Sequence, residues 1–229
     1  MTNKDIVTGI KNIIGPKLIS YGYRINSSKQ HYEKCLDGKC LYSRVYYRIV
    51  NYFSHEKKEA YKYVELSYLV YDKLLNSIVS TVLEELQITT IIDGHTNLIV
   101  VDLYSIDSGG LYNSKFLQSK DRNEQYGIFE NSNPIDILIE IRDTRITNVQ
   151  TIDNELADFG TFISQLSIKP LKPTAYSQNV VDRVIFIIYY FGTHDKNRLA
   201  EMQSEILKFS NTISSDYVEV INCLLKKFL

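Results

Sequence analysis

The chain lacks tryptophan and is poor in cysteine, with three cysteines among its 229 residues. An odd and small number of cysteines does not make the framework of a disulfide-rich scaffold. No uncharged apolar run reaches about 18 residues, the length that a membrane-spanning helix requires, and the sequence shows no internal repeat or low-complexity tract. These absences exclude the membrane-spanning and repeat classes and predict a globular protein with a sizeable core.

An excess of charge of one sign is also missing, because 26 lysines and arginines stand against 27 aspartates and glutamates. This balance creates no strong field for nucleic acid, so we do not expect a nucleic-acid partner. The opening residues, Met1 to Asp5, lack the apolar core of a secretory signal, which predicts a cytoplasmic protein without a membrane anchor. The pair Gly109-Gly110 lacks the other glycines and the lysine of a phosphate-binding loop. We therefore expect no cofactor, no metal site and no catalytic motif.

Tyrosine is abundant, with 18 residues, and many of them lie between Tyr42 and Tyr71. Apolar side chains alternate there with tyrosines and arginines, on both sides of the charged segment from Ser54 to Glu59. An alternation of period two gives a β-strand two different faces. The stretch therefore predicts a long β-hairpin that turns at Ser54 to Glu59.

The pairing of these strands follows from their turns. A two-residue turn at Asp37-Gly38 sets Cys35 opposite Cys40, and the second turn sets Arg48 opposite Glu65. Both registers place the same residues on the same side, and a slip by one residue destroys the agreement. The predicted core face carries Val45, Tyr47, Ile49, Val64, Leu66, Tyr68 and Val70. The opposite side, which we call the second face, carries Arg44, Tyr46, Arg48, Tyr63, Glu65 and Tyr71.

The segments around the hairpin predict the rest of a sheet and its covering helices. Asp5 to Tyr21 has apolar residues at helical spacing, and Gly22 is expected to end that helix. The same spacing recurs from Lys73 to Leu86. Further strands are predicted at Lys29 to Leu36, Thr89 to Asp93 and Thr96 to Tyr104. The fold class is therefore α+β, with an antiparallel sheet of about five strands, helices packed on it and a C-terminal helical part.

The second half of the chain is predicted to be mainly helical after a long loop from Ser105 to Asn133. Helices are expected at Pro134 to Arg145, Thr151 to Leu166, Asn179 to Phe191, Asp195 to Phe209 and Asp216 to Phe228. Gly192 is expected to end the third of these. The segment Lys169 to Pro173 is the best candidate linker. We therefore predict an α+β domain over 1–168 and a helical subdomain of three helices over 174–229.

The second face is the strongest candidate for a binding site. Tyrosine rings between guanidinium groups offer stacking, hydrogen bonds and charge, and these residue types dominate the binding energy of protein interfaces. We expect another protein to be recognised by this face or by the long loop. The alternative is structural, with Arg48 paired to Glu65 and the rings packed along the sheet or under the C-terminal helices. The candidate binding residues are Arg44, Tyr46, Arg48, Tyr63, Glu65 and Tyr71.

Cys35 and Cys40 are a candidate redox pair, because directly opposed residues on adjacent strands lie close enough for a disulfide. Two free thiols are the alternative, which a reducing cytoplasm favours. No second pair of cysteines or histidines lies at zinc-ligand spacing from them.

Two other functions stay open at this point. In one, histidines and carboxylates converge only in three dimensions and form the site of a hydrolase, which requires a pocket holding His95 with at least two carboxylates. In the other, the C-terminal helices pair with a second copy of the chain, so that the protein is a structural or regulatory subunit. The sequence does not set the oligomeric state.

The order of elements near the N-terminus resembles a known group of proteins. A helix ending in the glycine-aromatic segment Leu18 to Tyr23, followed by Arg24, a strand with His31-Tyr32 and a tyrosine-rich hairpin, is similar to a family of small bacterial α+β domains. Some members are grouped with immunity proteins of bacterial toxin systems. The resemblance covers Ile6 to Leu171 at most. It implies a binding role without catalytic residues, and it makes a toxin the expected partner.

Overall fold

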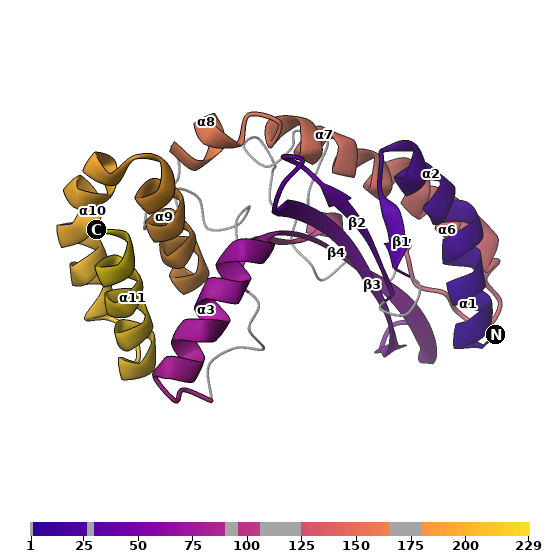
Figure 1. The fold of residues 1–229 in the computed structure, drawn as a ribbon. Coiled ribbons are helices and arrows are strands. Elements are labelled where there is room, and N and C mark those ends of the chain that lie inside the picture. Colours follow the sequence, from indigo (N-terminus) through magenta and orange to yellow (C-terminus); the bar gives the residue numbers. More distant parts are fainter. Residues whose placement is uncertain (1, 27–29, 90–95, 106–124, 165–179) are drawn as a thin grey trace. The chain divides into compact units, whose positions relative to one another are not determined.

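A computed structural model describes residues 2–26, 30–89, 96–105, 125–164 and 180–229 of the chain. The strands of this part form one five-stranded antiparallel sheet in which each strand lies beside its neighbour in sequence (Figure 1). Helices make up most of the remainder, so the predicted α+β class is confirmed. The strands are β1 (Arg24–Asn26), β2 (His31–Cys35), β3 (Leu41–Ser54), β4 (Glu59–Asp72) and β5 (Asn97–Asp102).

Two compact units make up the fold, and each is assembled from separate stretches of the chain. The first unit consists of Met1–Leu36, Ser43–Leu69 and Val101–Ala157, and the second unit consists of Asp37–Tyr42, Val70–Val100 and Asp158–Leu229. The predicted boundary between residues 168 and 174 falls within 165–179, outside the described residues. The division into 1–168 and 174–229 stays a prediction.

The first unit begins with a helical run that ends at a glycine. The run contains α1 (Asn3–Gly9), the π-helical turn η1 (Ile10–Ile14) and α2 (Gly15–Ser20). Gly22 follows with a φ of +90°, a conformation that residues with a Cβ atom rarely adopt. The predicted helix and its stop at Gly22 are therefore confirmed. Buried apolar side chains recur at every fourth residue of the run: Ile6, Ile10, Ile14 and Leu18.

A second helical run in the first unit differs from the prediction. α6 (Pro134–Ile141), the π-helical turn η3 (Arg142–Ile146) and α7 (Thr147–Glu155) follow one another without a break, where the sequence predicts two separate helices. Ile141 and Ile146 are both fully buried although they lie five positions apart. A π-helical turn closes over five residues rather than four, so it keeps both isoleucines on the buried side.

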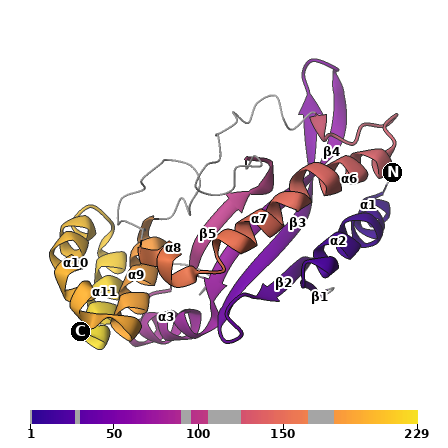
Figure 2. The same ribbon diagram turned by 90° about the horizontal axis from the view of Figure 1, so that it is seen from above.

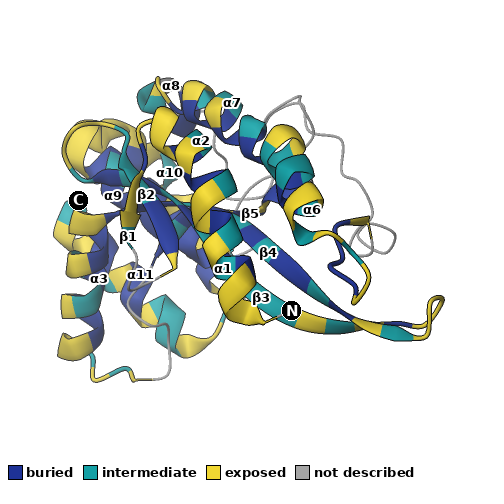
Figure 3. Cartoon of the chain, turned by 90° about the vertical axis from the view of Figure 1, so that its right-hand side faces the viewer, coloured by how far each residue is buried: buried dark blue, intermediate teal, exposed yellow. Residues whose placement is uncertain are grey.

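Both helical runs lie on the same face of the sheet, where α1 and α2 run beside α6 and α7 (Figures 1 and 2). The Tyr68 hydroxyl of β4 donates to Asp153 Oδ1 of α7 at 2.8 Å. Figure 3 shows β4 as a largely buried strand, whereas the turn of the hairpin is exposed. The predicted core face is confirmed, and Ile49 alone among its residues is partly exposed.

Side-chain contacts fix the register of β3 against β4. Arg48 forms an ion pair with Glu65, and the rings of Tyr52 and Tyr61 stack with their centroids 5.8 Å apart. Both pairs fit the register that the sequence predicts. The turn also lies where predicted, because β3 ends at Ser54 and β4 begins at Glu59.

The register of β2 against β3 is two residues away from the prediction. The Tyr47 N–H donates to the Gln30 carbonyl at 3.3 Å, and Arg44 pairs with Glu33 instead of lying opposite His31. A shift by an even number of residues leaves every side chain on its predicted face. The predicted assignment of residues to the two faces is therefore correct, although the predicted pairing of β2 with β3 is wrong.

The cause of this error is the connection between β2 and β3. Residues 36–40 join the strands, where the sequence predicts a two-residue turn. The Asp37 carboxylate accepts the backbone N–H groups of Lys39 at 2.8 Å and Leu41 at 3.0 Å, which holds the longer loop closed. In the observed register Cys35 and Cys40 are no longer directly opposed, so the predicted redox pair loses its geometric basis.

The composition of the sheet also differs from the prediction. β1 pairs with β2, with Ile25 opposite Tyr32, and three residues are too few for an alternation to show in the sequence. The strand predicted at Thr89 to Asp93 falls almost entirely within 90–95, outside the described residues. β5 confirms the strand predicted at Thr96 to Tyr104.

Helices account for most of the described part of the second unit. They are α3 (Lys73–Glu85), α8 (Phe159–Ser164), α9 (Val180–His194), α10 (Lys196–Ser210) and α11 (Ser215–Phe228). The three predicted C-terminal helices are therefore confirmed. The stop at Gly192 is wrong, because α9 continues through it to His194, and the missing side chain of Gly192 lets Phe228 of α11 pack close to it.

Among the helices of the described residues, none combines the length and the apolar character that crossing a bilayer needs.

Candidate protein-binding face

The second face of the hairpin is partly open in the first unit. The residues of β3 that alternate along it from Arg44 to Tyr52 are all at least partly exposed. The side chain of Arg48 is 61% exposed, and those of Arg44 and Glu65 are 23% and 25% exposed. Four of the six candidate binding residues lie on this open part: Arg44, Tyr46, Arg48 and Glu65.

Carboxylates hold both arginines in place. Arg44 Nη2 donates to Glu33 Oε1 at 3.0 Å, and Arg48 Nε donates to Glu65 Oε2. The Tyr52 hydroxyl donates to the other oxygen of Glu65 at 2.9 Å. Ion pairs at partly exposed positions add little to stability, but they restrict long side chains before a partner arrives, which lowers the entropy cost of binding.

Tyr46 lies between the two arginines on β3 and is partly exposed. Within the described part of the chain its hydroxyl forms no hydrogen bond and its ring makes no stack with another ring. The phenol is both a donor and an acceptor. Tyr46 therefore offers a partner the exposed part of its ring and a hydroxyl that forms no hydrogen bond with the described residues.

The other two candidate residues are buried, which corrects the predicted site. Tyr63 is 2% exposed and its ring lies 5.0 Å from that of Tyr104. Tyr71 is 4% exposed, and in the second unit it stacks on Tyr42 with centroids 5.9 Å apart. The sequence alternative of rings packed along the sheet thus holds for these two residues. They stabilise the fold and do not reach a partner in this conformation.

Two contributors to the face were not predicted. Tyr52 belongs to the same alternating series as Tyr46, so the alternation in the sequence was enough to place it on this face. Glu33 could be identified only from the observed register of β2 against β3, because it lies beside Arg44 in that register and not in the predicted one.

The chemistry of this face suits recognition. The hydrogen bond to Glu65 raises the pKa of Tyr52, so the phenol stays protonated at neutral pH. The hydrogen bond to Glu65 likewise raises the pKa of Arg48 and keeps the guanidinium charged. At neutral pH the face therefore presents the charged guanidinium of Arg48 and the neutral phenol of Tyr52.

Cys40 is held as a thiol in the second unit. Neither Cys35 nor Cys40 forms a disulfide, and Cys40 Sγ donates to Asp72 Oδ2 at 3.1 Å. Burial and this hydrogen bond raise the pKa of Cys40 to about 12. Since the thiolate is the reactive form of cysteine, we expect Cys40 to react slowly at neutral pH. A redox role for the pair stays a prediction.

The three described histidines differ in their exposure. His31 is buried, and His55 and His194 are exposed. Among the described residues no group of three or more histidine, cysteine, aspartate or glutamate side chains is placed to hold a metal ion. His95, on which the hydrolase alternative depends, lies outside the described residues, so that alternative stays a prediction.

A buried carboxylate in the first unit was also missed by the sequence analysis. Asp153 is 6% exposed. The hydroxyls of Tyr23 and Tyr68 donate to its Oδ1 at 2.9 and 2.8 Å, and Lys34 Nζ donates to its Oδ2 at 2.7 Å. These donors come from different strands and from the segment before β1, so Asp153 ties α7 to the sheet. Its environment is that of a structural carboxylate whose two oxygens both accept hydrogen bonds.

Comparisons with protein-family models, with curated proteins and with solved structures found no match to this chain. The resemblance to bacterial α+β domains grouped with immunity proteins therefore stays a prediction.

Proposed function

We propose that this protein binds another protein through the second face of the hairpin, with Arg44, Tyr46 and Arg48 as its central contacts and Glu65 beside them. The observation that supports this most is the state of Tyr46. It is partly exposed, its hydroxyl forms no hydrogen bond with the described residues, and it lies between arginines that Glu33 and Glu65 already hold. Pre-ordered tyrosine and arginine side chains are the residues that most often dominate binding energy at interfaces.

The charge of this face favours a protein as its partner. Each arginine is matched by a glutamate, so the face is close to neutral and offers rings and hydrogen-bonding groups. A nucleic acid is attracted by an excess of cations, which this face does not have. A toxin that is neutralised by such binding is the partner class that we propose, because the N-terminal resemblance implies it.

Single substitutions test this proposal. Tagged protein is used to recover its partner from cells that make both, and Arg44→Ala or Tyr46→Ala should recover at least about tenfold less partner than the original chain. Both substitutions lie on a partly exposed face, so thermal unfolding should change little.

Matched controls are Arg198→Ala and Tyr21→Ala, which remove an exposed arginine of α10 and a partly exposed tyrosine directly after α2. Both should recover the partner as well as the original chain does. Equal recovery by Tyr46→Ala and the original chain contradicts the proposal.

A further inference from the structure

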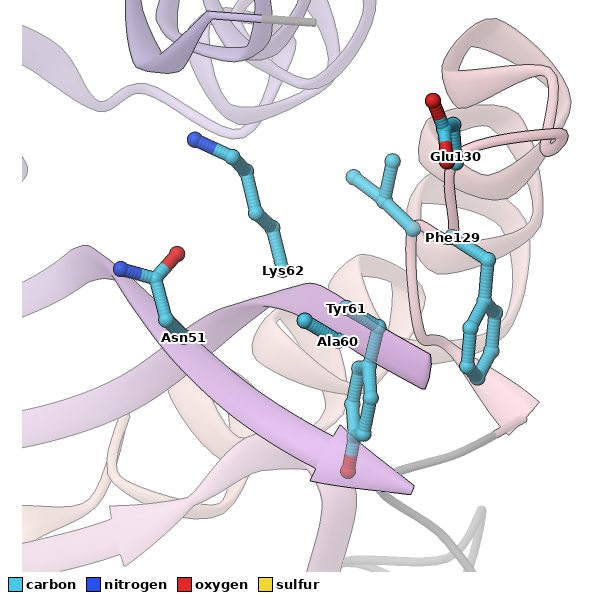
Figure 4. Close-up of a pocket in the computed structure, with 7 residues that line it drawn as sticks. Asn51, Ala60, Tyr61, Lys62, Phe129 and Glu130 are labelled. Atoms are coloured by element: carbon cyan, nitrogen blue, oxygen red, sulfur yellow. The ribbon is translucent and has the colours of Figure 1, made fainter. Parts of the chain in front are cut away.

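A pocket of about 290 Å³ lies at the far end of the hairpin, within the first unit. Figure 4 shows Lys62 and Tyr61 pointing to opposite sides of β4. The Lys62 ammonium donates to Asn3 Oδ1, so the fold already engages this cation. Pockets that hold small molecules start at about 300 Å³, and none of the residues that line this pocket has a buried side-chain polar atom without a partner. Such an atom lies in the second unit.

Asp182 is a buried carboxyl group with one oxygen that lacks a partner. It lies in the first turn of α9 and is 5% exposed. Its Oδ2 accepts the Asn97 N–H of β5 at 3.4 Å, which is long for a hydrogen bond. Its Oδ1 and the hydroxyl of Thr96, which precedes Asn97, find no hydrogen-bond partner among the described residues. The start of β5 is therefore joined to α9 through a carboxyl group that is poorly satisfied.

Asp153 of the first unit shows what Asp182 lacks. Asp153 is buried to nearly the same degree, at 6% exposed, but it accepts hydrogen bonds from three donors, one of them the Lys34 ammonium. Asp182 accepts one neutral N–H. Because a buried carboxylate is costly unless cations and donors hold it, we expect Asp182 to take up a proton more readily than Asp153.

Opposing influences set the protonation of Asp182. Burial favours the neutral acid and raises the pKa of Asp182 to about 7, although the hydrogen bond from the Asn97 N–H acts to lower it. The positive end of the helix dipole, at the first turn of α9, also favours the charged form. The carboxyl group therefore gains and loses its proton close to neutral pH, which an ordinary aspartate does not do.

The charged groups of the packed elements do not account for this behaviour. In the second unit, α8 and the described part of β5 carry no titratable side chain, and those of α3 and α10 are all exposed. Arg183 follows Asp182 on α9 and points about 100° away around the helix. The partly buried titratable groups of α11 are Asp216, Tyr217 and Cys223. None of these groups is among the causes that shift the pKa of Asp182.

We propose that Asp182 is a pH-sensitive latch, which holds the start of β5 against α9 while its carboxyl group carries a proton. When this proton is lost to water, the buried charge favours an open form in which the two elements separate and the carboxylate is hydrated. Protonation thus stabilises the closed form. This stabilisation is complete below about pH 4, falls as the pH rises towards 7, and is lost above about pH 7. The latch does not depend on the function proposed for the second face.

Titration of the carboxyl group tests the protonation directly. Carbon-13 NMR follows the side-chain carboxyl carbon of Asp182 in the isotope-labelled full chain, with the signal assigned through the backbone. Its midpoint should lie near pH 7, whereas an ordinary aspartate titrates near about pH 4.

Hydrogen exchange of the Asn97 amide tests the opening. Protection is the exchange rate in an unstructured peptide divided by the rate in the protein at the same pH. The closed form holds a proton that the open form releases, so protection of Asn97 should fall by more than about tenfold between about pH 5 and 7. Above about pH 7 it should change little, because both forms are then ionised.

Three variants assign this effect to Asp182. Asp182→Asn is neutral at every pH, so protection of Asn97 should stay nearly constant between about pH 5 and 7. Asp136→Asn removes an exposed carboxylate from the first turn of α6 and should leave the fall unchanged. Histidine also titrates in this range. His95→Gln, next to Thr96 in the sequence, should therefore keep the fall as well.

Four results overturn the proposal: a carboxyl midpoint near pH 4, constant protection of Asn97 in the original chain, a fall that persists in Asp182→Asn, or a fall that disappears in His95→Gln. The carboxyl titration and the exchange of the original chain decide the matter even when Asp182→Asn does not fold.

Discussion

Asp153 is a charged residue in an apolar core, and three donors hold it there. Asp153→Ala should lower the free energy of unfolding by about 3–5 kcal/mol, because Lys34 and two tyrosine hydroxyls lose their acceptor in a site of low dielectric. Urea unfolding followed by circular dichroism measures this loss. The control Asp136→Ala removes an exposed carboxylate from the first turn of α6 and should cost less than about 1 kcal/mol. Similar losses for both variants contradict the structural role of Asp153.

Cys40 provides a second test at the residue scale. Its pKa of about 12 follows from burial and from the hydrogen bond to Asp72, so little thiolate exists at pH 8. Iodoacetamide should therefore modify Cys40 in the folded protein at least about tenfold more slowly than in urea. Mass spectrometry of peptides from the two samples measures the ratio. Equal rates of modification in the folded protein and in urea would show that burial and the hydrogen bond to Asp72 do not protect the Cys40 thiol.

The sequence predicted the contacts of the second face better than the hydrogen bonds around Asp153. The alternation of tyrosine and arginine along β3 is local, and it placed Arg48 against Glu65 correctly. Asp153 lies 119 residues from Lys34 and 130 residues from Tyr23 along the chain. No local pattern connects residues so far apart, so their meeting follows only from the tertiary fold.

At the scale of elements, Gly192 marks the close packing of α9 on α11. A Cβ atom at this position would lie 2.5 Å from Phe228 Cβ, and that atom cannot move without shifting its helix. Gly192→Ala should therefore destabilise the protein by about 1–3 kcal/mol, although alanine favours a helix more than glycine does. Thermal unfolding measures the change.

Gly9→Ala is the matched control in another helix. Its Cβ atom would lie 2.6 Å from Leu138 Cδ1, which is the end of a side chain and can rotate away. The gain in helix propensity should then leave stability nearly unchanged. If Gly9→Ala destabilises the protein as much as Gly192→Ala does, the predicted difference between the two glycine sites is wrong.

Long periodic elements were predicted and short or irregular ones were not. α3 and the C-terminal helices have apolar residues at regular spacing, and the sequence located all four of them. The π-helical turn η3 lengthens the spacing of buried residues to five, which hid the continuity of α6 and α7. The Asp37 side chain closes a loop that backbone preferences alone predict as a two-residue turn.

At the scale of the whole molecule, buried tyrosines in both units set a limit to alkaline stability. Burial raises the pKa of Tyr23, Tyr68 and Tyr104 in the first unit and of Tyr189 in the second well above the ordinary value. The folded chain then holds protons that the unfolded chain releases near pH 10, so this stabilising contribution is complete below about pH 10 and falls as the pH rises further.

The free energy of unfolding should therefore fall steeply as the pH rises above about 10, after a smaller fall that begins near pH 9, where the unfolded chain releases the proton that folded Cys40 keeps. The ultraviolet absorbance of tyrosinate should rise together with loss of the circular dichroism signal. Ionisation of most tyrosines before unfolding contradicts their burial.

Binding through the second face is tested most directly by a cross-linking side chain at Tyr46. Benzoylphenylalanine at this position, activated by light in cells that make the protein and its partner, should give an adduct with a different protein. The same side chain at Tyr21, which directly follows α2 and lies outside the face, should give none. No adduct at position 46, an adduct only with a second copy of this chain, or equal adducts at both positions contradicts the proposed partner surface.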